Sequence, residues 1–456
     1  MAPFEPPDQN IDEYSVDVAA SSLSWVSSTG THRQVDLKDI VGVVRNPDSS
    51  SGYRVLFLES TEKEGEHNES NLHLLKLDIK SLPEGLSPFL VDIPSQLQRT
   101  EPVQVVVSTR SGTGTAKAVF QETVEPFLQY LGLEYLVYET QSAQTILELS
   151  RSHFLKDACA GIPQTILLLS GDGGLVDLVD VFYKSTKTLE VAPDIGLIPC
   201  GTGNAMASSI GLRAGPASGL RALLRGQPSP VPTFAASFSP GSRLVLDEGR
   251  QRAPIDSPSN GSYQTIYGAV VASWGLHAAL VADSDTAEYR KFGSERFKMA
   301  AKELLHPSDG TSPHRFQGQI TLTTSDVQTG EQSQRILTES EHMYVLATLV
   351  PRLEKDFLIS PDTEPLGGQM RFLRFGPLSG DEAMRLMILA YQGGKHVCDE
   401  LVTYEKVERL RIDFHEDLER WRRVCIDGKI VAVDERGWME LSKESRQLLN
   451  IIKPCV

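Results

Sequence analysis

Cysteine is scarce in this sequence and follows no redox or metal-binding pattern. The 456 residues include five cysteines, and no two of them have CxxC spacing. An odd, unpatterned set argues against a disulfide framework and against a zinc site, and it is typical of a reducing compartment. We therefore expect a cytoplasmic protein. The cysteines are Cys159, Cys200, Cys398, Cys425 and Cys455.

Long hydrophobic runs are also missing. No stretch reaches the roughly 18 apolar residues that a membrane-spanning helix needs. The longest mildly apolar stretch, residues 267–282, contains Trp274 and His277 and is predicted to be a buried pair of strands. The first residues, MAPFEPPDQNIDEY, are acidic and lack the apolar segment of a signal peptide. We expect a soluble chain that contacts membranes only peripherally and reversibly.

Positive charge is in deficit. Lys and Arg number 44 against 60 Asp and Glu, which gives a formal net charge of −16. Such a chain is repelled by nucleic-acid phosphates and by anionic lipid surfaces. We therefore expect no nucleic-acid partner, and any membrane contact must be apolar or use a local basic patch.

Length and composition predict several globular domains. Hydrophobic residues make up 40% of the chain and charged residues 23%, which is ordinary for globular proteins. A chain of 456 residues is too long for one ordinary domain. Residues 1–100 begin with a predicted disordered tail at 1–10 and continue as short strands between polar loops. This module resembles part of a pleckstrin-homology-like fold, although an unassigned β domain explains the pattern equally well.

The two following regions differ in their predicted secondary structure. Residues 101–235 alternate apolar strands (VQVVVS, EYLVYET, TILLLS, DIGLIP) with amphipathic helices, which predicts an α/β domain with a parallel sheet. Residues 236–456 begin with a predicted Pro-, Ser- and Gly-rich linker at 236–262. Antiparallel strands follow, interrupted by helical segments near 286–305 and 379–392.

Three glycine-rich loops follow apolar strands of the α/β region: STRSGTG at 108–114, SGDGG at 170–174 and PCGTGN at 199–204. At the carboxyl ends of parallel strands, such loops line the ligand crevice, and glycine lets the backbone approach a phosphate. Any one loop alone is more often a simple turn. Three on one sheet edge predict a nucleotide phosphate site.

Two common nucleotide motifs are absent from the sequence. There is no GxxxxGK[ST], so the chain is not a P-loop protein. No loop completes GxGxxG or GxGxxA, which disfavours a dinucleotide-dependent oxidoreductase.

Longer motifs resemble the sphingosine kinase and diacylglycerol kinase family, and sphingosine kinases most. They are SGDG followed by Asp177, PCGTGNAMA, WGLxA at Trp274, YRKFGSERF at 289–297, Gly394-x-His396 and Asp427-Gly428. The resemblance implies a phosphofructokinase- and NAD kinase-like three-layer nucleotide domain and a C-terminal antiparallel β-sandwich. It also implies phosphorylation of a lipid hydroxyl with ATP and Mg²⁺. NAD kinase itself is disfavoured by PCGTGN.

The resemblance assigns roles to individual positions. Asp172 would take the proton from the lipid hydroxyl. Asp172 and Asp427 would bind the metal, and Trp274 and Asp283 would contact the lipid. The nucleotide-binding positions are Ser108, Arg110, Ser111, Gly112, Thr140, Ser170, Gly171, Gly173, Gly201, Thr202, Gly203, Asn204, Arg290, Arg296, Asp427 and Gly428.

Structural alternatives exist for the charged candidates. Asp172 could be the N-cap of a helix over 175–184, a role that does not exclude catalysis. Arg290 and Arg296 could reach the ATP phosphates, which suit guanidinium groups, or could lie on a solvated helix face.

The sequence departs from the family pattern in three places. The first loop begins with Ser108-Thr109 instead of Asn-Pro, Lys429 replaces the Glu that usually follows Asp427-Gly428, and Ala279 replaces an Asp that meets the lipid's amine. Lys429 weakens the metal prediction and could contact phosphate instead.

These departures keep two classes of function open. The first is an active kinase that phosphorylates a sphingoid base, diacylglycerol or a related long-chain alcohol. Its tunnel for the acyl chain would lie in the β-rich region, residues 236–456. The other is a kinase-fold protein with weak catalysis that binds lipid or partners. The sequence also leaves open whether the chain forms a homodimer.

Overall fold

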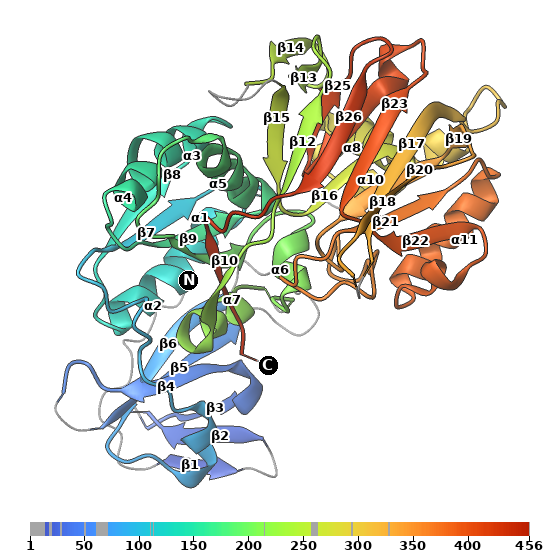
Figure 1. Ribbon diagram of the computed structural model, residues 1–456. Helices are drawn as coiled ribbons and strands as arrows, with labels where there is room; N and C mark the ends of the chain where they lie inside the picture. The colour runs from blue at the N-terminus through green and yellow to red at the C-terminus, as the bar shows by residue number, and fades with distance from the viewer. Residues whose placement is uncertain are drawn as a thin grey trace.

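The structure is a computed structural model that describes residues 14–17, 21–27, 30–49, 52–60, 72–109, 111–112, 114–213, 215–256, 263–292, 295–326 and 329–455 (Figure 1). For residues 14–17, 287 and 290 only the backbone path is described. The predicted tail at residues 1–10 lies outside the described residues.

The N-terminal module consists of two three-stranded antiparallel sheets. Strand β5 is buried on both faces, since its successive residues face different cores: Val55 and Phe57 pack with Trp25, whereas Leu56 and Leu58 pack toward the following α/β region. The strands are β1 (Tyr14–Asp17), β2 (Ser22–Val26), β3 (His32–Asp36), β4 (Ile40–Arg45), β5 (Tyr53–Ser60) and β6 (Leu72–Ile79), with short helical turns η1 (Leu37–Asp39) and η3 (Glu84–Phe89).

A six-stranded sheet forms the centre of the molecule, in the order β11-β27-β10-β9-β7-β8. The strands from β27 to β8 pair in parallel, and β11 pairs antiparallel to β27 at the edge. They are β7 (Val103–Val107), β8 (Tyr135–Glu139), β9 (Thr165–Ser170), β10 (Asp194–Pro199), β11 (Gln227–Pro230) and β27 (Asn450–Lys453).

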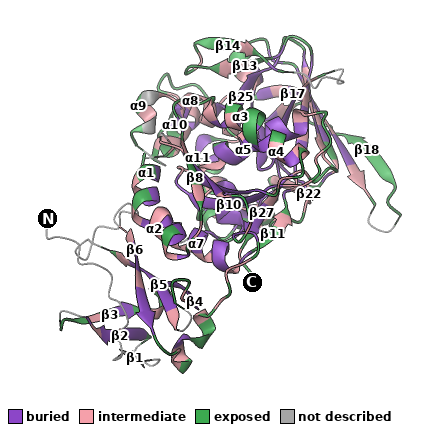
Figure 2. Ribbon diagram, turned by 90° about the vertical axis from the view of Figure 1, so that its left-hand side faces the viewer, coloured by how far each residue is buried: buried purple, intermediate pink, exposed green. Residues whose placement is uncertain are grey.

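Helices cover both faces of this sheet, as the continuous apolar strands predict. In β9, Ile166 and Leu168 contact the core that contains α5, whereas Leu167 and Leu169 contact the opposite core with α1, α2 and α7. Figure 2 shows β10, an inner strand of the sheet, and α5 largely buried, whereas the edge strands β8 and β11 are more exposed. The helical segments are α1 (Ala116–Val119), η4 (Phe120–Val124), α2 (Glu125–Tyr130), α3 (Thr145–Leu149), η5 (Ser150–Phe154), α4 (Leu155–Cys159), α5 (Asp172–Lys184), α6 (Ala205–Ser209) and α7 (Gly215–Arg225).

The C-terminal part contains two antiparallel sheets that share a core. One has the order β15-β12-β26-β23-β17-β18, with β19 beside β17, and the other β14-β13-β25-β24-β16-β20-β21-β22. Phe234 and Phe238 of the first sheet pack in the same cluster as Trp274 and Val345 of the second.

These sheets are built from strands β12 to β26. The strands are β12 (Phe234–Phe238), β13 (Arg243–Leu246), β14 (Gln251–Pro254), β15 (Gln264–Gly268), β16 (Val271–Gly275), β17 (Phe316–Ser325), β18 (Gln332–Ile336), β19 (Glu341–His342), β20 (Tyr344–Thr348), β21 (Arg371–Phe375), β22 (Val402–Lys406), β23 (Arg409–Phe414), β24 (Arg423–Ile426), β25 (Lys429–Ala432) and β26 (Trp438–Lys443). The helical segments are α8 (Leu276–Ser284), α9 (Ala287–Arg290), α10 (Glu295–Leu305), α11 (Gly380–Tyr391), η6 (Lys395–Cys398) and η7 (Glu419–Arg422).

The predicted helices near 286–305 and 379–392 are confirmed by α9, α10 and α11. Two other predictions were wrong in part. The predicted linker contains the end of β12 and the hairpin β13–β14, whose first strand also pairs with β25. The stretch 267–282 continues from the turn between β15 and β16 into α8, so it is a strand pair followed by a helix.

The chain returns to the central sheet at its end. After β26, residues 444–449 cross from the C-terminal sheets, and β27 pairs with β10 through Asp194↔Asn450 and Ile195↔Ile451 (Figure 1). The sequence analysis places these last residues with the other strands of residues 236–456, because a four-residue strand carries no sign of its distant partner. The two parts are therefore connected by two chain crossings.

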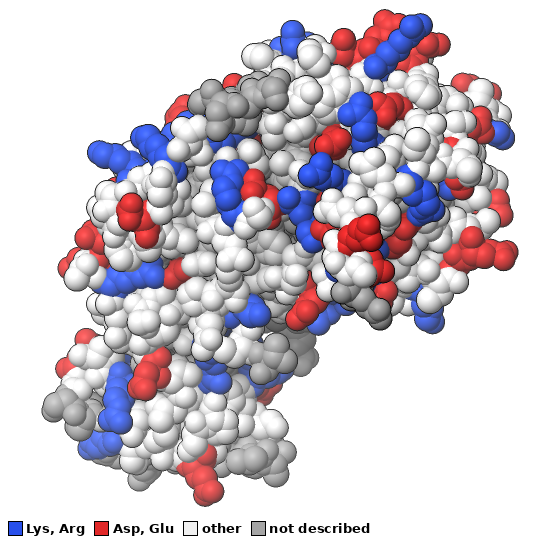
Figure 3. Space-filling model, in the orientation of Figure 1, with Lys and Arg blue, Asp and Glu red and all other residues white. Residues whose placement is uncertain are grey.

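The surface carries both signs of charge. Figure 3 shows Lys and Arg interspersed with Asp and Glu on the visible face. Among the described residues, no helix is both long enough and apolar enough to cross a membrane.

Candidate functional site

The three glycine loops meet at the carboxyl edge of β7, β9 and β10. The backbone N–H of Gly171 donates to Ser111 Oγ at 2.8 Å. A Cβ on Gly112, which has φ +55°, would lie 2.6 Å from the carbonyl oxygen of Cys200, and a Cβ on Gly201 would overlap the Cα of Gly171. The prediction that the loops share one sheet edge is confirmed, and glycine is required where their backbones touch.

The GTGN loop is closed by its own asparagine. Asn204 Oδ1 accepts from the N–H of Gly201 at 2.9 Å, and Asn204 Nδ2 donates to the Gly201 carbonyl at 2.8 Å. Asn204 itself has left-handed backbone angles (φ 50°, ψ 48°) and immediately precedes α6. Gly203 lies against the C-terminal part, since a Cβ there would be 3.3 Å from the carbonyl oxygen of Leu353.

Asp172 is the first residue of α5 and binds the start of another helix. Its Oδ2 accepts from the N–H of Ala205 at 2.7 Å, and its Oδ1 from the N–H of Met206 at 2.9 Å. The alternative that Asp172 caps its own helix was wrong: α5 begins at Asp172, and the carboxylate caps α6 instead. Burial raises the pKa of Asp172, while the N–H groups of Met206 and Ala205 act in the opposite direction.

The first loop is attached to the end of β8. Thr109 N–H donates to Thr140 Oγ1 at 3.1 Å, and Thr109 Oγ1 donates to the Thr140 carbonyl at 2.8 Å. Thr140 is buried, so its hydroxyl holds the loop in place. Ser108 N–H bonds to the Leu169 carbonyl, while Arg110 lies outside the described residues.

Asp427 lies in the turn between β24 and β25, with left-handed backbone geometry (φ 49°). Its carboxylate accepts N–H bonds from Ala269, Val270 and Val271 at 2.5–3.3 Å and so holds the turn between β15 and β16. Burial, aided by the negative charge of Asp172 and opposed by these N–H groups, raises the pKa of Asp427 to about 7.

Lys429, two residues later, pairs with α5. Its Nζ lies 3.0 Å from Asp177 Oδ1 and 3.7 Å from Asp180 Oδ2. Burial acts to lower the pKa of Lys429, but the two carboxylates outweigh it and raise the pKa. The ammonium group is therefore engaged by protein carboxylates.

One cavity of about 1010 Å³ joins the loops to an apolar chamber. Its polar end includes Asp172, Gly171, Gly173, Thr202 and Gly428. The chamber walls are aliphatic and aromatic side chains from the C-terminal part, among them Val271, Leu280, Phe297, Phe357, Met384 and Met387. Such a cavity can hold a phosphate donor at one end and a hydrocarbon chain at the other.

Sequence reasoning missed several polar residues of the chamber wall. His277 Nδ1 lies 2.7 Å from Ser273 Oγ, and burial lowers the pKa of His277 to about 4, so the ring is neutral near pH 7. Tyr391 donates to Glu354 Oε2 at 3.2 Å, and burial raises the pKa of Glu354. Tyr344 is buried beside His277. Only His277, a polar residue inside an apolar stretch, gave any signal in the sequence.

The predicted lipid contacts do not reach this cavity. Trp274 is fully buried between the two C-terminal sheets, where its Nε1 donates to the Trp421 carbonyl at 2.8 Å. Asp283 pairs with Arg420 at 2.8 Å and lines an adjoining cavity, which shares Asp285, Gly428 and Lys429 with the first. The contact prediction for Trp274 is therefore corrected: tryptophan fills the core because it offers the largest apolar surface. The lipid contact of Asp283 stays a prediction.

The two predicted arginines have different outcomes. Arg296 lines the cavity, and its Nη1 lies 3.6 Å from Asp285 Oδ1. The side chain of Arg290 lies outside the described residues. Its phosphate-binding role stays a prediction.

Asp172 fits a magnesium ion better than Asp427 does. The described residues contain no group of three or more His, Cys, Asp or Glu side chains that could hold a metal. Mg²⁺ in kinases needs only one or two carboxylates beside the substrate phosphates. Each oxygen of Asp172 accepts one backbone N–H, whereas the oxygens of Asp427 share four contacts, about as many as a carboxylate has lone pairs.

Comparison with known proteins follows this geometry. Residues 102–236 match the family described as diacylglycerol kinase catalytic domain. The chain is 28% identical over 204 residues to sphingosine kinase 1 of Arabidopsis thaliana, which covers 44% of this chain and 36% of that protein. It is 22% identical over 282 residues to sphingosine kinase 2 of Homo sapiens, which covers 60% of this chain and 36% of that protein.

A solved structure gives a weaker similarity. The chain matches a diacylglycerol kinase of Bacillus anthracis strain Sterne with a TM-score of 0.45 and 12% identity, over 77% of this chain and 97% of that one. This similarity is too weak to bear on function. The matched regions span about a third of the named sphingosine kinases. The family match and these relatives support the sphingosine kinase and diacylglycerol kinase superfamily, and the match to a kinase catalytic domain covers residues 102–236.

Proposed function

We propose that this protein is an ATP-dependent lipid kinase that phosphorylates a hydroxyl group of a sphingoid base or a related long-chain lipid. One observation carries the proposal: a single cavity connects the glycine loops and Asp172 to an apolar chamber. A water-soluble phosphate acceptor would not need such a chamber, because burying apolar walls against a polar ligand gains nothing. The relatives named as sphingosine kinases favour a sphingoid base, and diacylglycerol is the alternative.

The proposed reaction needs one base and a cradle for phosphate. Asp172 accepts the proton of the lipid hydroxyl as that oxygen attacks the γ-phosphorus of ATP; the new O–P bond forms while the bond to the β-phosphate oxygen breaks, releasing ADP. The backbone N–H groups of the loops orient the phosphates. Mg²⁺ bound with ATP at Asp172 would offset phosphate charge. A raised pKa brings Asp172 closer to the operating pH, which favours a general base.

The surroundings of the reaction are also proposals. We propose a cytoplasmic protein that takes its lipid from a membrane surface by peripheral, reversible contact, with no nucleic-acid partner. A homodimer is left open.

A catalytically weak lipid-binding protein is the second candidate. Lys429 favours it, because this position carries an ammonium paired with Asp177 where the family pattern has a carboxylate.

A direct assay separates these functions. Purified protein is incubated with labelled ATP and sphingosine, ceramide, diacylglycerol or NAD. We expect labelled product with sphingosine or diacylglycerol and none with NAD. ATP binding without transfer to any lipid would support the weak-catalysis candidate, and labelled NAD would overturn the lipid-kinase proposal.

A further inference from the structure

Lys429 joins the helix that carries Asp172 to the C-terminal sheets. It is the first residue of β25, and its Nζ contacts Asp177 at 3.0 Å and Asp180 at 3.7 Å on α5. The exposed fractions of these side chains are 25% for Lys429, 16% for Asp177 and 12% for Asp180. The pair is shielded from solvent, so its attraction is stronger than that of a surface ion pair.

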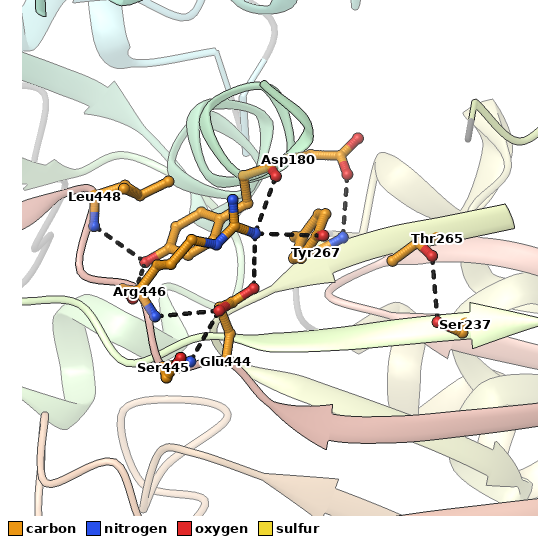
Figure 4. Close-up of polar contacts among 9 residues, drawn as sticks. Asp180, Ser237, Thr265, Tyr267, Glu444, Ser445, Arg446 and Leu448 are labelled. Carbon is orange, nitrogen blue, oxygen red and sulfur yellow. Dashed lines mark hydrogen bonds and ion pairs between the residues drawn. The ribbon is translucent and has the colours of Figure 1, made fainter. Parts of the chain in front are cut away.

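The far end of α5 is held by the same part of the molecule. Asp180 Oδ1 accepts from the backbone N–H of Tyr267 in β15 at 3.1 Å (Figure 4). The guanidinium of Arg446 lies 5.2 Å from the ring centre of Tyr183 and 5.6 Å from that of Tyr267, and its Nη2 donates to the Tyr183 carbonyl at 3.2 Å. Arg446 belongs to the returning segment 444–449, so α5 is bound to the C-terminal part over two turns.

The helix transmits this attachment to the catalytic edge. An α-helix rises about 1.5 Å per residue, so Asp177 stands roughly 7.5 Å along the axis from Asp172. A shift of the helix at Asp177 therefore moves Asp172. On the opposite side, the turn that precedes Lys429 contains Asp427, which holds the β15–β16 turn at the cavity wall. Residues 427–429 therefore contact both sides of the cavity.

We propose that Lys429 is a positioning residue, whose ion pair with Asp177 and Asp180 sets the distance between Asp172 and the lipid chamber. The proposal rests on the proposed kinase function. It explains why an ammonium is tolerated where the family pattern has a carboxylate: a glutamate here would face the two carboxylates of α5 and repel the helix.

Lys184 provides a matched control. Its Nζ also contacts Asp180 Oδ2, at 3.0 Å, but both residues stand on α5 and the pair crosses no boundary. Lys429→Met and Lys184→Met each remove one ammonium partner of Asp180. The double variant Asp177→Lys with Lys429→Glu restores an ion pair of reversed sign at the same place.

The arrangement of the two parts can be measured on native cysteines. Cys398, in the C-terminal part, and Cys455, beside the central sheet, are both exposed and accept nitroxide labels, with Cys159→Ser in the background to avoid a third label. Electron–electron resonance gives the distance between the labels, and turnover and ATP affinity are measured on the same variants.

We expect a narrow distance distribution in the wild type and in Lys184→Met, and a broadened or shifted one in Lys429→Met. Turnover should fall about 10- to 100-fold in Lys429→Met, since small misplacements of reacting groups have effects of this size, while ATP affinity changes little. The reversed pair should recover both quantities. Unchanged distances and turnover in Lys429→Met, or no recovery in the reversed pair, would overturn the proposal. If the wild type transfers no phosphate to any lipid, but Lys429→Met still changes the label distance, the kinase function is overturned. Lys429 would then only hold α5 against the C-terminal sheets.

Discussion

The two ends of the cavity are built in different ways. At the loop end, the backbone makes the site: Gly171 and Gly201 are in contact, and neighbouring strands deliver each loop to the same edge. At the chamber end, side chains make the site, and they come from segments as distant in sequence as Val271 and Met387. Short motifs can therefore reveal the first end, whereas the second depends on the packing of the whole C-terminal part.

The largest expected effect concerns the residue between the two ends. Asp172→Asn should reduce lipid phosphorylation by about 10²- to 10⁴-fold, because an amide cannot accept the proton of the lipid hydroxyl. An asparagine oxygen can accept from Ala205 or from Met206, but its NH₂ group would face the other N–H. We therefore also expect a loss of about 1–3 kcal/mol of stability. Turnover, ATP affinity and thermal unfolding check the three effects.

The result for Asp172→Asn can contradict the mechanism directly. Near-normal turnover would show that Asp172 only caps α6. A loss of turnover that accompanies unfolding would leave the capping role as the explanation, so the comparison is made at a temperature where the variant is folded. Asp172→Glu is less informative, since a longer side chain would also displace α6.

A second prediction tests the backbone contact at the loop end. Gly201→Ala would place a methyl group on the Cα of Gly171, with no flexible side chain to move aside. We expect a loss of ATP affinity of about 100-fold, at the upper end of overpacking costs. Gly173→Ala is the matched control, because a Cβ at Gly173 meets nothing within 4 Å. Equal ATP affinities by calorimetry in the two variants would show that the contact is unimportant for the nucleotide.

The loop end was predictable because each of its features is local. A strand of continuous apolar residues followed by glycine and a helix predicts a phosphate loop wherever the strands are parallel, and three such units gave the shared edge. The start of α5 at Asp172 was missed by a few residues. The target of its carboxylate was also missed, since Ala205 and Met206 are more than thirty positions away and carry no special side chain.

The chamber end was predicted only as a general expectation. Trp274 was assigned to the lipid from its motif, but its ring packs in the core with Phe316 and Phe414. Nothing in the spacing of Glu354 and Tyr391 indicates that they meet, because the contact depends on how α11 packs. The partner of Lys429 was missed for the same reason: the motif shows the exchanged charge, and only the fold shows Asp177 beside it.

A third prediction concerns the packing of the C-terminal part and its dependence on pH. His342 is fully buried; its Nδ1 accepts from Arg374 at 2.9 Å, and its Nε2 donates to the Gly318 carbonyl at 3.1 Å. Burial, together with the Arg374 charge, lowers the pKa of His342 from 6.5 to about 4. Above pH 6.5 the ring is neutral in both states. As the pH falls toward 4, the unfolded chain binds a proton that the folded chain excludes, so stability decreases.

His342→Gln removes this titration while keeping one donor and one acceptor. Between pH 7 and pH 5 the wild type should lose on the order of 2 kcal/mol more stability than the variant. Denaturant unfolding at each pH measures the difference, and His277 is present in both proteins, so its own contribution cancels. Parallel stability curves would show that His342 is protonated without cost.

The smallest expected effect lies in the hydroxyl that connects the first two loops. Ser111 Oγ accepts from the N–H of Gly171 at 2.8 Å, and Ser111→Ala removes that acceptor without changing the backbone. A single hydrogen bond contributes about 0.5–1.5 kcal/mol net, so ATP affinity should fall by roughly 2- to 12-fold. Ser111→Thr keeps a hydroxyl and should retain most of the affinity. If serine, alanine and threonine bind ATP equally, the glycine contacts alone position the loop; if alanine and threonine are equally weak, the shape of the side chain matters more than its hydrogen bond.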